Sequence, residues 1–214
     1  MKKTDEKERK LSKAERKRQE KFEIKKREML SDGYEMKEHT LGIVYANIMA
    51  VVVSLPLMLP MIALYIYFNW GKGSMRLMDT SELVLFGISV VAFIVIHELV
   101  HGATWACFSK HGFKSISFGI MAEMCTPYCT CSEPLKKGSY LTGTLMPLFI
   151  VGFLPSVIAA YYGYVWLFVT GLIMIMGAGG DIIISHRLVR YKSEKADVVY
   201  YDHPTKCGFI TFER

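Results

Sequence analysis

Two histidines and a glutamate inside an apolar stretch are the residues of this sequence best suited to chemistry. They belong to the run His97-Glu98-Leu99-Val100-His101. Residues four apart on an α-helix share one face, so the two imidazoles can bind the same metal ion. Glu98 lies beside the first histidine, within reach of a water that the metal activates. The spacing therefore predicts a catalytic zinc (Zn2+) site with His97 and His101 as ligands and Glu98 as general base.

A catalytic zinc ion usually has three protein ligands, so another one must come from elsewhere in the chain. Cys107 stands where the extended soluble motif has its third histidine, which excludes that soluble class. We favour Asp181, because this acid lies between a glycine-rich run and three isoleucines, where a charge is costly in a membrane helix. The alternative is that Asp181 is an acid at a helix end that faces the membrane interface or pairs with Arg187. The other acids and histidines considered are His111, Glu123, Glu133 and His186.

Four apolar stretches must carry these residues, and they cover 41–70, 83–108, 140–166 and 167–185. A helix needs roughly 20 apolar residues to cross the hydrocarbon core of a membrane, and each stretch comes close to or exceeds that length. A short turn at Tyr162-Gly163-Tyr164 separates the last two stretches. We therefore expect an all-α integral membrane bundle of four transmembrane helices, with a small cytoplasmic hairpin loop and a charged N-terminal helix.

The distribution of Lys and Arg predicts the orientation of the bundle. The first 40 residues hold 14 of them, the loop 109–139 holds four, and the segment 186–214 holds six. Because cytoplasmic segments of membrane proteins are enriched in Lys and Arg, we expect a multi-pass protein of the cell membrane with both termini in the cytoplasm. The chain then divides into a cytoplasmic tail at 1–40, a transmembrane metallopeptidase-like domain at 41–185 and a second cytoplasmic tail at 186–214.

This orientation gives the candidate ligands a common depth. His97 lies about 14 residues, or roughly 21 Å, into a helix that runs toward the cytoplasm. Asp181 lies near the end of another helix that runs the same way. Both residues therefore belong to the cytoplasmic half of the membrane.

The N-terminal tail carries 24 of the 46 charged residues, which leaves 22 for the other 174 positions. Its charge pattern predicts a helix over about 5–30, with pairs four apart such as Glu23 and Arg27. No apolar stripe runs along this helix, since Phe22 and Met29 are isolated, so we expect a solvated tail. Attraction to anionic lipid head groups is the alternative. Nucleic-acid binding is not expected, because acids are interleaved with the basic residues and no stacking aromatics accompany them.

Three short motifs resemble a known family. The HELVHG run at 97–102, the GGD at 179–181 and the Asp202-His203-Pro204 turn with Gly208-Phe209 resemble the bacterial zincin peptidases, a family built on a membrane domain of unknown function. The resemblance covers roughly 85–214. More distantly, the chain is similar to site-2 protease-type intramembrane metalloproteases, in which an aspartate from a later helix completes the zinc site. The resemblance implies peptidase activity, with the three ligands and the base named above.

The loop 109–139 contains an alternating run at 114–121, which predicts a strand or a hairpin. In site-2-type enzymes such a strand offers its edge to an extended substrate; here a plain connecting hairpin is an equal alternative. The spacing of Cys125, Cys129 and Cys131 matches no standard zinc site, so small buried thiols are favoured over a second metal site. A short apolar strand is expected at 208–212.

The expected function is that of a membrane-embedded zinc metallopeptidase, which hydrolyses a membrane or membrane-adjacent polypeptide. One alternative is a non-catalytic membrane protein that binds metal or uses the polar cluster for assembly. Another is a metal-dependent hydrolase that acts on a lipid. Glu98 favours an enzyme, because metal binding by His97, His101 and Asp181 requires no glutamate.

Overall fold

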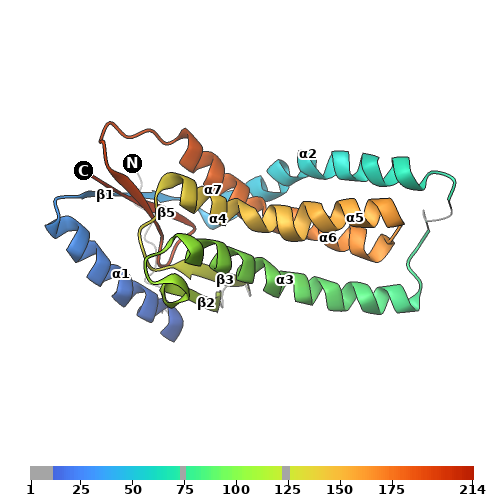
Figure 1. Ribbon diagram of the computed structural model, residues 1–214, viewed down its shortest axis with the longest axis horizontal. Helices are drawn as coiled ribbons and strands as arrows, with labels where there is room; N and C mark the ends of the chain where they lie inside the picture. Colours follow the sequence, from blue (N-terminus) through green and yellow to red (C-terminus); the bar gives the residue numbers. More distant parts are fainter. Residues whose placement is uncertain (1–11, 73–75, 122–125) are drawn as a thin grey trace.

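A computed structural model describes residues 12–72, 76–121 and 126–214 of the chain. Long helices lie side by side along the longest axis of the molecule, and the strands gather with α1 (Lys13–Ser31) at one end (Figure 1). The C-terminus also lies at that end. The molecule therefore has an apolar helical body and a smaller, charged cap.

Among the residues that the structure describes, three helical stretches are long and apolar enough to cross a membrane. They are α2 (Ile43–Asn69), α3 (Thr80–Phe108) and the stretch Lys137–Tyr162. A fourth candidate is the pair α6 (Val165–Gly177) and α7 (Gly179–Arg190), which is bent by 41° at a short break. The expected membrane bundle is thus supported with three spans, or four if the bent pair counts as one.

The stretch Lys137–Tyr162 contains three segments. They are α4 (Lys137–Pro147), a π-helical segment η2 (Leu148–Phe153) and α5 (Leu154–Tyr162). Pro147 and Pro155 flank the π-helical segment. A proline lacks the N–H of a regular helical hydrogen bond, so a local change of helical type is tolerated there. Gly163, with φ 79°, ends α5 in the left-handed conformation, at the turn that the sequence predicts.

Polar side chains join the helices inside the bundle. Ser89 of α3 and Thr170 of α6 share a hydrogen bond of 2.7 Å between their hydroxyls. Asn69, at the end of α2, donates to the backbone carbonyl of Ala160 in α5 at 2.8 Å. The apolar residues of α2 and α3 remain largely exposed, which fits contact with lipid.

The all-α expectation is correct only in part, because the cap contains a three-stranded antiparallel sheet of order β1-β5-β4. Its strands are β1 (Glu35–Thr40), β4 (Val198–Asp202) and β5 (Gly208–Glu213). The edge strand β1 has the polar sequence EMKEHT and lacks an apolar strand pattern, so its pairing with a strand far along the chain was not visible. The predicted strand at 208–212 is confirmed as β5.

Helix α1 packs on this sheet. It begins at a capping box formed by Ser12 and Glu15, later than the helix expected from the sequence, and the expected residues before 12 lie outside the described part. Phe22 and Met29 are buried against Tyr201, Ile210 and Phe212. The tail is therefore anchored by two apolar residues that lie seven apart, two turns along the same face.

The expected hairpin is confirmed as β2 (Ile116–Met121) and β3 (Thr126–Cys131), which pair antiparallel. Both strands lie against α3, where Ile116 and Phe118 occupy the space beside Gly102. Cys129 and Cys131 are buried free thiols, whereas Cys125 lies outside the described residues. Burial raises the pKa of the Cys131 thiol to about 12, as expected for a small buried side chain.

Candidate metal centre

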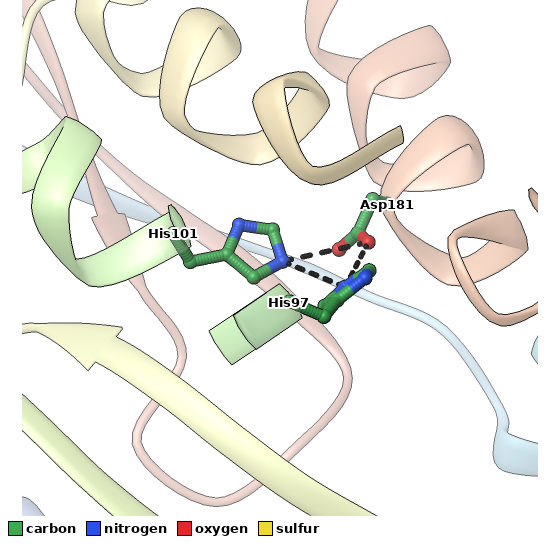
Figure 2. Close-up of side chains that lie close together, drawn as sticks. All are labelled: His97, His101 and Asp181. Atoms are coloured by element: carbon green, nitrogen blue, oxygen red, sulfur yellow. Dashed lines mark hydrogen bonds and ion pairs between the residues drawn. The ribbon is translucent and has the colours of Figure 1, made fainter. Parts of the chain in front are cut away.

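Figure 2 shows the side chains of His97, His101 and Asp181 pointing toward one another from α3 and α7. The two Nε2 atoms of the histidines are 3.2 Å apart. Oδ2 of Asp181 lies 3.3 Å from Nε2 of His97 and 3.5 Å from Nε2 of His101. Within residues 12–72, 76–121 and 126–214, this is the only set of three His, Cys, Asp or Glu side chains so placed.

These separations fit a zinc ion. Ligand atoms at about 2.0–2.1 Å from zinc in a tetrahedron lie about 3.3 Å from one another. The three measured separations, 3.2, 3.3 and 3.5 Å, all lie near that value. Two imidazole nitrogens and one carboxylate oxygen are also a donor set that catalytic zinc sites use. The residues present therefore fit a zinc ion with one coordination position left over.

A backbone contact fixes the tautomer of His101. Its Nδ1 lies 2.8 Å from the carbonyl oxygen of Gly143 in α4, and a carbonyl only accepts, so Nδ1 carries the proton. In the neutral ring, Nε2 is then a free lone pair directed at the centre. Metal-binding histidines commonly donate their second nitrogen to a carbonyl in this way.

Helix α4 comes close to His101 because Gly143 has no side chain. A Cβ at this position would lie 2.1 Å from the ring of Trp105. That ring stacks on His101, with centroids 5.1 Å apart and an angle of 15° between the planes. Trp105 also donates from Nε1 to the carbonyl of Tyr140 at 3.2 Å. His101 is therefore held from two sides before any metal binds.

The break between α6 and α7 positions Asp181. The chain bends at Ala178 and α7 begins at the next residue. Asp181 lies in the first turn of α7, facing α3. Gly179 lies against α2, where a Cβ would come within 2.5 Å of the carbonyl oxygen of Ala50. The lack of a side chain at Gly179 thus lets two helix backbones approach closely, whereas a Cβ on Gly180 would meet no atom within 4 Å.

Glu98 lies beside the three candidate ligands, close enough for its charge to interact with theirs. The backbone N–H of Cys129 in β3 faces its carboxylate. Glu98 is half-buried, so its carboxylate retains some access to solvent. This placement suits a proton acceptor more than a fourth ligand, because a base must reach both the attacking water and the leaving group.

The other candidates from the sequence lie apart from this centre. His111 and Glu133 contact each other at the base of the hairpin, where Glu133 also accepts from Ser115 at 2.5 Å. His186 is exposed. Arg187 donates to the carbonyl of Thr40 at 3.1 Å rather than pairing with Asp181. Glu123 lies outside the described residues.

Three residues that support the centre are not predicted from the sequence: Trp105, Tyr140 and Gly143. Trp105 had a usable signal, since it lies four residues after His101 and thus on the same helical face. Gly143 and Tyr140 gave none, because their role depends on how α4 packs against α3. Such packing is not encoded in any local pattern.

Comparison with known proteins yields one match. Residues 90–195 match the model of a family described as "Putative zincin peptidase". No curated protein and no solved structure matches the chain. The matched segment contains all four residues of the centre, namely His97, Glu98, His101 and Asp181.

Proposed function

Because residues 90–195 belong to the zincin peptidase family, we propose that this protein is a membrane-embedded zinc metallopeptidase. In this proposal, His97, His101 and Asp181 bind zinc and Glu98 is the general base. The observation that carries it is the convergence of three ligand atoms, 3.2–3.5 Å apart, from α3, which is apolar enough to cross a membrane, and from α7, the second half of the bent pair that could cross it together. Packing alone gives no reason to gather three ionisable groups at that place.

The chemistry divides between the metal and the protein. Zinc, when bound, polarises the scissile carbonyl and lowers the pKa of a water molecule. Glu98 accepts the proton of the attacking water and returns it to the nitrogen of the leaving amine. The carbonyl of Gly143 and the ring of Trp105 hold His101 in place throughout, so the ligand does not reorient during the reaction.

The proposed substrate is a polypeptide within or beside the membrane, reached from the cytoplasmic half. The ligands His97 and His101 lie in the second half of α3, the half that leads into the hairpin, which supports this side if the hairpin is cytoplasmic. A substrate helix must unwind first, because its carbonyls are otherwise hydrogen-bonded within the helix. Within the described residues, the strand β2 pairs with β3 along one edge only, so its other edge is the one proposed to hold the unwound segment.

A substrate-trapping comparison tests the proposal. Membrane proteomes would be compared for cells that carry the wild type, Glu98→Gln or Glu82→Gln. Glu82 lies on the same helix but in its first turn, paired with Arg76 at 2.8 Å, so it serves as the matched control. We expect at least one polypeptide to accumulate uncleaved with Glu98→Gln only. Identical proteomes for the wild type and Glu98→Gln would contradict the peptidase, and an accumulated lipid would favour a lipid hydrolase.

A further inference from the structure

Asp202, at the end of β4, connects two elements that lie on either side of the metal centre. Its Oδ1 accepts a hydrogen bond of 2.5 Å from the hydroxyl of Tyr140 in α4. Its Oδ2 accepts a hydrogen bond of 2.9 Å from the backbone N–H of Cys131 in β3. One carboxylate from the C-terminal tail therefore joins α4 to β3.

The α4 side of this connection leads to the ligand His101. Tyr140 is only 2% exposed, and its carbonyl accepts from the Trp105 ring that stacks on His101. Three residues later, the carbonyl of Gly143 accepts from Nδ1 of His101. The placement of Tyr140, and with it α4, against α3 thus sets where both supports of His101 lie.

The β3 side leads to the base Glu98. Cys129 precedes Cys131 by two residues, and alternate residues of a strand direct their N–H groups to the same edge. The amide of Cys131 is bound by Asp202, while that of Cys129 faces the Glu98 carboxylate. Two acids from different parts of the chain therefore occupy neighbouring positions on one edge of β3.

We propose that Asp202 is a positioning residue of the metal centre. It holds α4, which supports His101, and β3, which faces Glu98, in a fixed position relative to each other. This inference rests on the proposed function. A carboxylate suits the role because it accepts from two donors at once, one on each oxygen. An amide of the same shape presents an NH2 group to one of those donors, and this group cannot accept a hydrogen bond. The residue lies beyond the segment 90–195, so the tail contributes to a centre that the matched segment does not complete by itself.

The test measures zinc affinity of the full-length protein in detergent, by competition with a chelator of known affinity. Asp202→Asn and Tyr140→Phe are each expected to weaken zinc binding about tenfold, the lower end of the effect of outer ligand partners. The absorption bands of the cobalt-substituted protein should shift in both variants, because they report the geometry of the ligands. The double variant should lose less affinity than the sum of the two losses, since both changes break one connection.

Glu213→Gln is the matched control. Glu213 is a buried carboxylate of the same sheet, and none of its four donors, Lys37, Tyr191, Ser193 and Thr211, hydrogen-bonds to Asp202, Tyr140 or a candidate ligand. Its substitution should leave zinc affinity and the cobalt spectrum unchanged. If the wild type binds zinc and Asp202→Asn and Tyr140→Phe bind it equally well with unchanged cobalt spectra, the positioning role is wrong and the proposed function stands. A wild type that binds no zinc overturns both.

Discussion

Two clusters of buried polar side chains in this protein differ in how their hydrogen-bonding groups are matched. At the metal centre, Nε2 of His101 is a free lone pair in the neutral ring, and it faces the His97 nitrogen and the Asp181 carboxylate. Metal binding requires both rings in this neutral form, in which three ligand atoms meet with at most one N–H, from His97, among them. In the cap, the Glu213 carboxylate receives four donors, from Lys37, Tyr191, Ser193 and Thr211.

We expect this difference between a cluster that binds a cation and one that is structural. A buried acceptor with a full set of donors is stable as it stands and needs no ligand. A group of facing acceptors lacks that balance, and a cation supplies what is missing. We therefore expect changes at the metal centre to alter zinc binding and turnover, and changes at the Glu213 cluster to alter folding stability alone.

The largest expected effect is that of Glu98→Gln on turnover. The amide cannot accept the proton of the attacking water, and general bases typically contribute about 10²- to 10⁴-fold to rate. Cleavage of a polypeptide identified by substrate trapping should fall by that factor, while the zinc content remains that of the wild type. Full activity in this variant would contradict the role of Glu98, because turnover would then not depend on its carboxylate.

Gly143→Ala should have the next largest effect. The added methyl would meet the Trp105 ring, so α4 must shift away from His101, at a cost of about 1–3 kcal/mol for an overpacked core. Both thermal stability and zinc affinity should decrease. Gly138→Ala on the same helix is the control, because its methyl meets no atom within 4 Å. Equal behaviour of the two variants would show that α4 does not support the ligand.

The smallest expected effect is an acid-dependent loss of stability in the cap. Burial raises the pKa of Glu213, but hydrogen bonds from Lys37, Tyr191, Ser193 and Thr211 outweigh burial and lower the pKa to about 2. A lowered pKa stabilises the folded state above the unfolded value of about 4.3, and this contribution is lost as the pH falls toward 2. The wild type should therefore lose stability between these pH values more steeply than Glu213→Gln in denaturant unfolding. If the stability of the wild type and of Glu213→Gln falls in parallel with pH, the four donors do not lower the pKa of Glu213, and the description of this cluster is wrong.

The sequence revealed the metal centre better than the cap. Glu98 and Asp181 were recognisable because a charge within an apolar stretch has a high cost and needs a reason. The pairing of β1 with β5 was not recognisable, since Glu35–Thr40 is polar and its partner lies near the other end of the chain. Asp202 belonged to a motif that carried the family resemblance, but its contacts with Tyr140 and Cys131 depend on tertiary packing. Local chemistry is visible in a sequence, whereas long-range support is not.

The zinc content of the full-length protein, purified in detergent without chelators, tests the central claim most directly. The account predicts about one zinc per chain in the wild type and in His186→Ala, whose histidine is exposed on α7. It predicts almost none in His97→Ala, because two remaining ligands bind zinc too weakly to survive purification. A metal-free wild type, or a His97→Ala variant with the zinc content of the wild type, would contradict it.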